Sequence, residues 1–416
     1  MKIYALSLGC PKNLVDTERF LADAAGKRWE VVAEPLEADI LFLNTCAFLT
    51  EAVTESRNFL KELISLKGQF PAKKIYLAGC LVSRFGKVIL TEFPEVDRLI
   101  YPDEIVDLPN RFLCTPPYYA YLKISEGCNN RCSYCLIPSL RGRLHSYPME
   151  RLIAEANSLA AGGVKELNVV AQDTTAYGVD IYGRPLLSDL LKEICRVDGL
   201  RWVRLLYTYP TGYNAGLIKV LEKEEKVCHY LDIPFQHASD QILSAMGRRG
   251  SQKDYRSLIK TLRSAIPDLT LRTTFIVGFP GETERDFKIL LDFVEEIGFE
   301  KLGLFAYSPE QGSRAAALPG QVPEDLKEER LERLRRVQEK ISRKKLKSFV
   351  NRKVEVLVEG ADPENGRRSC GRTRYDAPEV DGVVYLNRRT KEGTFATVRI
   401  TSSSLFDLYG KVLDSE

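Results

Sequence analysis

Three closely spaced cysteines, Cys128, Cys132 and Cys135, are the residues of this sequence best suited to chemistry, and we call them the clustered cysteines. They form a C-x3-C-x2-C run within residues 121–142, directly after an apolar segment that is typical of a strand. Three thiolates at this spacing can hold an iron–sulfur cluster. A cubane contains about four irons, so three ligands leave one iron open to a small molecule. The alternatives are a zinc site, which usually takes four ligands and favours C-x2-C pairs, and a disulfide pair.

A second set, Cys10, Cys46 and Cys80, is scattered in the sequence but follows one rule, and we call these the strand-end cysteines. Each lies a few residues beyond a short apolar segment that is typical of a strand. Those segments are residues 2–6, 39–43 and 74–78. Because the carboxyl ends of strands in an open α/β sheet form its binding crevice, we expect the three thiols to converge and bind metal. Loop cysteines that merely pack are the alternative. Packing is the favoured interpretation for Cys114, Cys195, Cys228 and Cys370.

The composition sets broad limits on the chain. At 416 residues it is long for one domain and comfortable for three. Its 44% hydrophobic and 28% charged residues are ordinary for a soluble globular protein, and no apolar run is long enough to predict a membrane span. Ten cysteines without a recognisable secretory signal indicate metal or redox chemistry in the cytoplasm. A formal net charge of +3 is low for a protein that binds nucleic acid through phosphates.

The apolar segments predict an α/β fold in which two parts alternate strands and helices. Residues 1–115 carry the three strands named above and helical patterns over 14–25, 51–66 and 83–92, which predicts a doubly wound α/β domain. Residues 120–322 carry six further βα units. Six are too few for a closed eight-stranded barrel, so we expect an open (β/α)6 barrel with its chemistry at the carboxyl ends of the strands. The six predicted strands are 121–125, 167–171, 202–207, 229–234, 270–277 and 301–307.

The carboxyl-terminal part, residues 323–416, has a different character. Residues 323–348 are predicted to form a linker helix, and ten basic residues against six acidic ones within 323–347 leave RNA binding as the less favoured interpretation. Residues 349–416 contain strand patterns separated by turns, which suggests a small antiparallel β-barrel. The predicted strands are 354–360, 382–386 and 394–401. This segment has eleven basic and eleven acidic residues, so it would bind bare nucleic acid poorly.

Residues around the second barrel strand are candidates for binding a small ligand. Gly162, Gly163 and Glu166 precede the strand, and Gln172 follows it in the segment AQDTTAYG. Glycines let the backbone approach a ligand closely, and an acid can hold an amino group. A helix C-cap explains the two glycines equally well.

Other candidates lie on later strands. The segment IVGFPGET runs from a strand into a turn containing Gly278 and Gly281, whose backbone amides could contact an adenosine or a carboxylate. Arg204 and Arg272 lie inside apolar strands, where a charge must be paired or face the barrel lumen, and either is a candidate partner for a carboxylate. His237 follows the fourth strand, and a satisfied structural histidine is its favoured interpretation. No acid–base catalytic residue is expected, because no Ser-His-Asp arrangement is visible.

The order of these parts resembles the methylthiotransferase family of radical S-adenosylmethionine (SAM) enzymes, over nearly the whole chain. The cysteine run resembles the radical SAM signature, with Tyr134 where that family has an aromatic residue. The resemblance implies that the clustered cysteines hold a [4Fe-4S] cluster whose open iron is chelated by SAM. An electron from the cluster then cleaves SAM and releases a 5′-deoxyadenosyl radical, which can remove a hydrogen from an unactivated carbon.

The resemblance also assigns roles to the rest of the chain. It implies that the strand-end cysteines bind a second, auxiliary [4Fe-4S] cluster, and that the last domain is of the TRAM type. Elements at the places of the candidate glycines, acid, amide and arginines contact SAM in the radical SAM family. Three motifs resemble the branch that converts an aspartate of small-subunit ribosomal protein 12 to 3-methylthioaspartate. They are LGCPKNLVDTE (8–18), AQDTTAYG (171–178) and GRTRYDAPEVDG (371–382).

The implied partners are protein 12 or the assembled small subunit and an electron donor such as flavodoxin or ferredoxin, with the chain acting as a monomer away from membranes. Two alternatives remain: a tRNA adenosine methylthiotransferase, and a non-catalytic iron–sulfur module that binds RNA. A ribosomal-protein loop is expected to be basic, and an acidic surface would attract it. We therefore expect Asp376, Glu379 and Asp381 to dock the protein substrate.

Overall fold

The computed structural model describes residues 1–106 and 110–413, and its contacts divide the chain into two compact units. The first unit is Met1–Leu186 with Val197–Gly199 and Ser308–Ala316. The second is Leu187–Arg196, Leu200–Tyr307 and Ala317–Glu416. These units cut across the four predicted segments 1–115, 120–322, 323–348 and 349–416, so that domain division stays a prediction.

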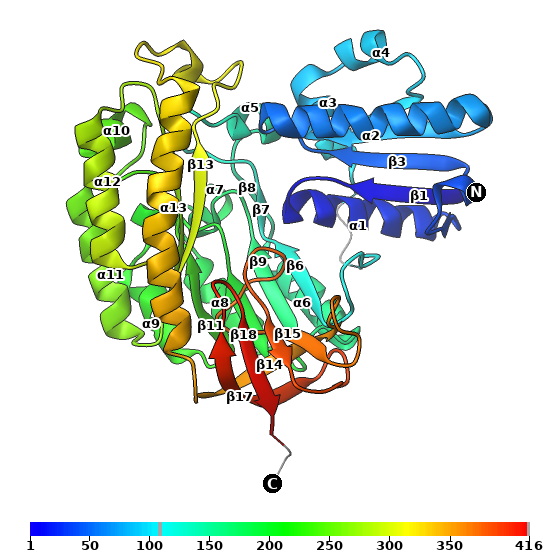
Figure 1. Cartoon of the computed structure of the whole chain (residues 1–416). Coiled ribbons are helices and arrows are strands. Elements are labelled where there is room, and N and C mark those ends of the chain that lie inside the picture. The colour runs from blue at the N-terminus through cyan, green and yellow to red at the C-terminus, as the bar shows by residue number, and fades with distance from the viewer. Residues whose placement is uncertain (107–109, 414–416) are drawn as a thin grey trace. The chain divides into compact units, whose positions relative to one another are not determined.

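The first unit begins with a parallel five-stranded sheet that has helices on both faces (Figure 1). Its elements are β1 (Lys2–Ser7), α1 (Pro11–Gly26), β2 (Glu30–Val31), β3 (Ile40–Thr45), α2 (Thr50–Gln69), β4 (Lys74–Gly79), α3 (Cys80–Phe85), α4 (Val88–Glu92) and β5 (Arg98–Ile100). The strand order is β2-β1-β3-β4-β5. Neighbouring residues of β3 pack into different buried clusters. Phe42 lies in the same cluster as Leu21 of α1, and Leu43 lies in the same cluster as Leu60 of α2. The predicted doubly wound α/β domain is therefore confirmed.

The three strands predicted here match β1, β3 and β4 within two residues at each end. The helix predicted over 83–92 is wrong in detail, because the structure has two short helices there. Helix α3 already begins at Cys80, and Gly86, with φ +53, ends it before α4. A left-handed glycine after a helix is a common stop signal.

The next group of strands has β9 beside β6 within the first unit and the order β13-β12-β11-β10 within the second. Within the first unit, β6 and β9 are parallel, and within the second unit β10, β11, β12 and β13 are parallel. The elements in the first unit are β6 (Tyr119–Lys123), β7 (Ser125–Glu126), α5 (Ile137–Arg141), β8 (His145–Ser146), α6 (Met149–Ala161), β9 (Glu166–Val170) and α7 (Val179–Tyr182). Those in the second are α8 (Leu187–Cys195), β10 (Trp202–Leu205), α9 (Ala215–Lys223), β11 (Val227–Asp232), α10 (Asp240–Ala245), α11 (Gln252–Ala265), β12 (Thr270–Val277), α12 (Glu284–Ile297), β13 (Lys301–Ala306) and α13 (Glu324–Lys347). All six predicted barrel strands are found within two residues of their expected ends.

Helix α13 is the predicted charged helix, and it packs along α12 and β13. Its buried side is largely polar: Lys327 donates to the carbonyl of Tyr307 at 2.9 Å, and Arg330 pairs with Glu282 at 3.0 Å. Among the described residues, no helix has both the length and the apolar character needed to cross a membrane.

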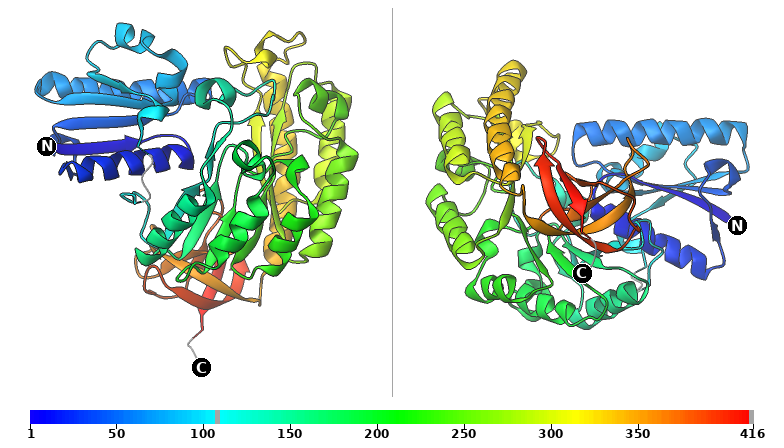
Figure 2. Two further views of the ribbon diagram at one scale, coloured as in Figure 1. Left: turned by 180° about the vertical axis from the view of Figure 1, so that it is seen from behind. Right: turned by 60° about the horizontal axis from the view of Figure 1, so that its bottom comes forward.

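The carboxyl-terminal strands form a closed barrel in the order β14-β15-β16-β18-β17, red and orange in Figure 2. They are β14 (Lys353–Ala361), β15 (Ser369–Thr373), β16 (Val384–Leu386), β17 (Phe395–Ser403) and β18 (Leu408–Val412). Alternate residues such as Val356, Val358, Val398 and Ile400 fill its core. The pairs are antiparallel except β16 with β18, which is parallel. The last three residues of the predicted domain lie outside the described part of the chain.

Candidate iron–sulfur site

The strand-end cysteines share one edge of the first sheet. Cys10 is the N-cap of α1, three residues after β1, Cys46 directly follows β3, and Cys80 directly follows β4. Strands β1, β3 and β4 are neighbours in the sheet. The expectation that the three thiols lie at the same carboxyl edge is confirmed, with Cys10 and Cys46 at the point where the strand order reverses, the usual binding place of such sheets.

Close backbone packing holds these loops together. Gly9, with φ +89, lies so near Cys46 that an added Cβ would stand 2.6 Å from the cysteine Cβ and 3.0 Å from its Sγ. The Asn13 side-chain amide donates to the carbonyls of Leu8 and Thr45, both at 2.9 Å. These contacts join the loop before α1 to the end of β3, so the first two thiols are fixed relative to each other.

The strand-end thiols influence one another electrostatically. Burial raises the pKa of the Cys46 thiol to about 11, and Cys80 and Cys10 add to this shift. Burial also raises the pKa of Cys80, although Arg141 opposes it. For Cys10, burial would raise the pKa, but Lys12 and Arg141 together hold it below its ordinary value. Because thiolates, not thiols, bind metal, the nearby cation Arg141 assists all three.

The clustered cysteines lie on the loop between β7 and α5. Gly127, with φ +73, allows this loop to close, since a Cβ there would stand 2.2 Å from the carbonyl oxygen of Arg143. The backbone amide of Asn130 donates to Cys128 Sγ and that of Ile137 to Cys135 Sγ, each at 3.4 Å. Amides directed at sulfur stabilise thiolates and lie around the sulfurs of protein-bound clusters.

The donor chemistry of both sets fits iron–sulfur clusters. All ten cysteines lie within the described residues, and none of them forms a disulfide. In the described part of the chain, no three Cys, His, Asp or Glu side chains stand close enough together to hold a single metal ion. A cluster makes no such demand, because each thiolate binds a different iron atom.

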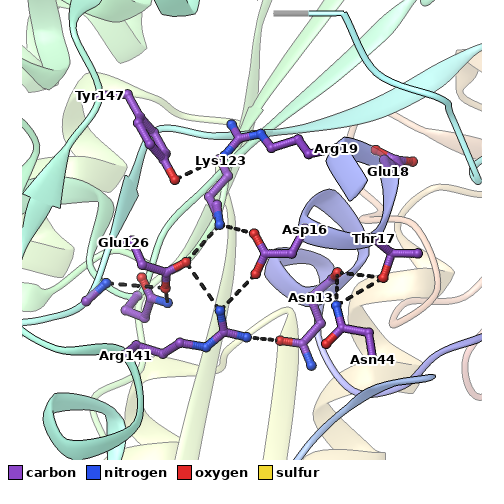
Figure 3. Close-up of polar contacts among 12 residues, drawn as sticks. Asn13, Asp16, Thr17, Glu18, Arg19, Asn44, Lys123, Glu126, Arg141 and Tyr147 are labelled. Carbon is purple, nitrogen blue, oxygen red and sulfur yellow. Dashed lines mark hydrogen bonds and ion pairs between the residues drawn. The ribbon is translucent and has the colours of Figure 1, made fainter. Parts of the chain in front are cut away.

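A network of largely buried charges, drawn in Figure 3, is linked to both cysteine sets, because Arg141 donates to Cys80 and Glu126 stands two residues before Cys128. Lys123, the last residue of β6, pairs with Asp16 of α1 and, at 2.8 Å, with Glu126. Arg141 pairs with the same two carboxylates, at 2.8 Å from Asp16 and 3.4 Å from Glu126. Burial would raise the pKa of Glu126, but Lys123 and Arg141 lower it to about 2. Glu126 is therefore charged at neutral pH, and the network joins two cations to two carboxylates.

The segment Ser308–Ala316 of the first unit contacts the loops of both cysteine sets. Buried Glu310 accepts hydrogen bonds from the Thr50 amide at 2.8 Å and hydroxyl at 3.1 Å, and pairs with Arg84 at 3.3 Å. Thr50 and Arg84 each stand four residues after a strand-end cysteine. The amide of Ala315 donates to the carbonyl of Ser133, between two clustered cysteines, at 2.9 Å. One short segment thus fixes both sets of loops.

The candidate ligand residues around β9 separate into two groups. Gly162 is the C-cap of α6, and Gly163 and Glu166 lie at the amino end of β9, whereas the clustered cysteines follow the carboxyl end of its parallel neighbour β6. This placement favours the helix-cap interpretation of the glycines. Gln172 follows the carboxyl end of β9, and its side-chain amide donates to Glu126. It is the one member of this group that the structure brings to the cysteine edge.

The turn after β12 is occupied by internal contacts. The Glu282 carboxylate accepts hydrogen bonds from the amides of Gly278 at 2.8 Å and Phe279 at 3.3 Å, so this acid takes the place expected for a ligand. The amide of Gly281 donates to the carbonyl of Gly320 at 2.8 Å. His237 is fully buried, with Nδ1 accepting from the Ser239 amide at 2.9 Å, which agrees with a structural role.

The two strand arginines also have internal partners. Arg204 is fully buried, donates to the carbonyl of Arg374 at 2.9 Å, and lies 4.9 Å above the ring of Tyr230. Arg272 pairs with Asp232 of β11 at 2.9 Å. Both arginines therefore contact groups of the protein, and the role of either as partner of a ligand carboxylate stays a prediction.

The three residues expected to dock the substrate, Asp376, Glu379 and Asp381, differ in their surroundings, and their docking role stays a prediction. Asp376 is buried and pairs with Lys301 of β13 at 2.7 Å. Asp381 accepts from the hydroxyl of buried Tyr230 at 2.7 Å. These contacts join the last barrel to strands of the same unit. Glu379 is exposed, with φ +68.

Sequence reasoning missed the network around the cysteines. Asp16, Glu126 and Arg141 each lie inside or next to a motif that the sequence singled out, but charge and spacing alone did not link them. Asp173, in AQDTTAYG, accepts from the Asn130 side chain at 2.7 Å and so supports the loop of Cys128. These residues could have been found because their motifs all follow parallel strands, which is the rule that predicts the positions of the cysteines.

Comparisons with known proteins define the class first. The description "Radical SAM superfamily" matches residues 122–294, "TRAM domain" matches 350–413, and "Uncharacterized protein family UPF0004" matches 2–100. Among solved structures, the radical SAM methyltransferase TsrM from Kitasatospora setae shares the fold at 14% identity, with a TM-score of 0.56 over 73% of this chain and 72% of that one. The chain is thus a radical SAM protein with an additional amino-terminal α/β domain and a TRAM barrel.

Sequence relatives narrow the class to one family. Proteins named ribosomal protein uS12 methylthiotransferase RimO are 44% identical in Geobacter sulfurreducens (99% of this chain, 98% of the relative) and 44% identical in Pelotomaculum thermopropionicum (99% of both). One from Clostridioides difficile is 41% identical over 99% of both chains. This chain belongs to the RimO family of methylthiotransferases, as the resemblance implied. Its cofactors are SAM and [4Fe-4S] clusters, and the amino-terminal domain is the second-cluster domain of methylthiotransferases.

Proposed function

We propose that this chain adds sulfur and a methyl group to the β-carbon of an aspartate in ribosomal protein uS12, giving 3-methylthioaspartate. One observation carries the proposal: two separate sets of three cysteines, none of them in a disulfide, follow parallel strands within one unit. Two sets of thiolates, each able to leave an iron open, exceed what a structural metal requires. The identity of the substrate rests on the name of the relatives.

The residues of the site have distinct tasks in this proposal. The clustered cysteines would hold the cluster that binds and cleaves SAM, which supplies a carbon radical able to remove a hydrogen that no base could take at neutral pH. The amides of Asn130 and Ile137 stabilise the thiolates, and Asp173 orients Asn130. The strand-end cysteines would hold the auxiliary cluster that provides the sulfur. The chain would work in the cytoplasm as a monomer, with flavodoxin or ferredoxin as its electron donor.

The test supplies anaerobically reconstituted protein with SAM, reductant and either intact small ribosomal subunits or tRNA. We expect 5′-deoxyadenosine in both reactions and a methylthio group, detected by mass spectrometry, on uS12 alone. The matched variant Cys46→Ala should still cleave SAM but add no methylthio group. Modification of tRNA instead of uS12, or methylthiolation by the Cys46→Ala protein, would refute the proposal.

A further inference from the structure

Arg141 extends from the loop of one cysteine set to a thiol of the other. It is the last residue of α5, the helix that begins two residues after Cys135. Its Nε donates to the Sγ of Cys80 at 3.4 Å, and its side chain is only 2% exposed. A guanidinium nitrogen directed at a buried cysteine sulfur is an unusual use of an arginine that already has carboxylate partners.

The orientation of the guanidinium is fixed by three other side chains. Nη1 contacts Asp16 and Glu126, and Nη2 donates to the side-chain oxygen of Asn13 (Figure 3). Every nitrogen of Arg141 therefore has a partner. Because the guanidinium is planar and rigid, these contacts on one edge dictate that Nε is directed at the sulfur of Cys80.

The surrounding charges show that the thiol contact is not required to neutralise the arginine. Asp16 and Glu126 supply two negative charges against the two positive charges of Arg141 and Lys123. The quartet is balanced without Cys80. A hydrogen bond from a cation to a cluster thiolate stabilises the more negative, reduced form of the cluster and so raises its reduction potential.

We propose that Arg141 is a positioning residue that raises the reduction potential of the auxiliary cluster through its hydrogen bond to Cys80. The inference rests on the proposed function only in assigning an auxiliary cluster to the strand-end cysteines. Because the same side chain is anchored by Glu126, two residues before Cys128, it also ties the auxiliary ligand to the start of the other cysteine loop.

The experiment measures a potential and does not depend on turnover. In a full-length chain whose clustered cysteines are all replaced by Ala, only the auxiliary cluster should load, with about four irons. Its potential is measured by redox titration followed by electron paramagnetic resonance. Arg141→Gln should shift the potential to a more negative value at unchanged iron content.

Two further variants make the result specific. Arg19→Gln removes another buried cation of the region, one that pairs with Glu155 at 3.4 Å, and it should leave the potential unchanged. Arg141→Lys keeps the charge but cannot reach Cys80, Asp16 and Glu126 together, so its potential should also lie below that of the unsubstituted protein. If the Arg141→Gln protein does not bind the auxiliary cluster, the potential measured for Arg141→Lys tests the proposal.

The outcomes separate the two proposals. An unchanged potential in loaded Arg141→Gln or Arg141→Lys protein, or an equal shift in Arg19→Gln, would overturn the role of Arg141 and leave the proposed function intact. Failure of the strand-end cysteines to bind iron in the parent chain would instead refute the auxiliary cluster, and with it both proposals.

Discussion

The charges around Arg141 and those around Asp376 are buried to a similar degree, yet only the first group touches a thiol. Around Arg141, two cations and two carboxylates share contacts, and one nitrogen remains for Cys80. Around Asp376, the carboxylates contact no thiol: Asp376 pairs with Lys301 and accepts from the Thr373 hydroxyl, and Asp381 accepts from Tyr230. The contacts of the second group join the TRAM barrel to strands of the same unit.

The two groups also lie at opposite ends of their strands. Lys123 ends β6 and Glu126 follows it, whereas Lys301 begins β13. Arg374 donates to the carbonyls of Glu225 and Val227 at the start of β11. In α/β barrels the carboxyl ends carry the chemistry and the amino ends carry stability. Buried charge alone does not distinguish a functional group from a structural one. The two kinds of group are distinguished by the strand end at which the charges lie and by the atom that they contact.

Removing either cysteine set should give the largest effect. Replacing the clustered cysteines with Ala should leave about four of about eight irons and abolish 5′-deoxyadenosine formation. Replacing the strand-end cysteines should also leave about four irons but preserve SAM cleavage. Iron analysis and chromatography of the nucleoside measure both results. Cys370→Ser, which alters a half-buried thiol outside both sets, is the control and should keep all the iron. Loss of all iron from either triple variant would contradict independent sites.

Asp376→Asn should destabilise the protein without affecting SAM cleavage. It removes the carboxylate partner of the half-buried Lys301, and losing a hydrogen bond between charged groups costs about 1.5–3 kcal/mol. Urea unfolding of the full chain measures the loss, and Glu364→Gln, an exposed acid of the same barrel, should change stability by less than about 0.5 kcal/mol. Normal stability with impaired modification of uS12 would instead support the docking role of Asp376.

The pH dependence of the free energy of unfolding follows from the pair of Asp376 and Lys301. Burial would raise the pKa of Asp376, but Lys301 lowers it below its ordinary value. A depressed folded-state pKa gives stability that is present above the unfolded pKa of about 3.9 and is lost as pH falls through the folded value. The difference between the parent chain and Asp376→Asn should therefore shrink as the pH falls below about 4.

The cysteine positions were predictable because they depend on strand ends, and strands with a strong apolar pattern can be found from sequence. Cys10, Cys46 and Cys80 needed only the three segments before them. The same rule should have placed Gly162 and Gly163 away from the site, since a loop that precedes a parallel strand lies at its amino end.

Pairing of distant charges was not predictable. Arg141 and Asp16 are 125 residues apart in sequence, and many acids could have served as the partner. The acidic loop shows the converse error. Its sequence is locally polar, so it was interpreted as surface, but Asp376 is buried because Lys301 offers a partner that no local pattern reveals.

Glu310→Gln should weaken the binding of iron by the strand-end cysteines, and this effect should be smaller than that of replacing the cysteines. The change removes a buried charge that accepts from Thr50 and Arg84, at a cost of about 1–3 kcal/mol. Because those residues follow the strand-end cysteines, iron held there should be lost to a chelator faster, while the clustered site keeps its iron. Glu92→Gln, which breaks the more exposed pair with Arg57, is the matched control. Equal rates of iron loss in the two variants would show that Ser308–Ala316 does not support the site.

Tyr375→Phe should give the smallest effect, and it tests whether the contacts at the amino ends are purely structural. The Tyr375 hydroxyl donates to Asp268 at 2.8 Å, but the Asp268 side chain is 48% exposed and also contacts His229. The ring packs edge to face on Phe349 at 5.6 Å, and this contact survives in the variant. A single hydrogen bond near solvent is worth about 0.5–1 kcal/mol, so stability should fall by no more than that. SAM cleavage and uS12 modification should both stay at the parent level.

A loss as large as that of Asp376→Asn would mean that the exposed contact, not the buried pair, holds the barrel to its unit. A change in SAM cleavage would mean that the amino ends influence the chemistry, and the division between the two groups of charges would fail.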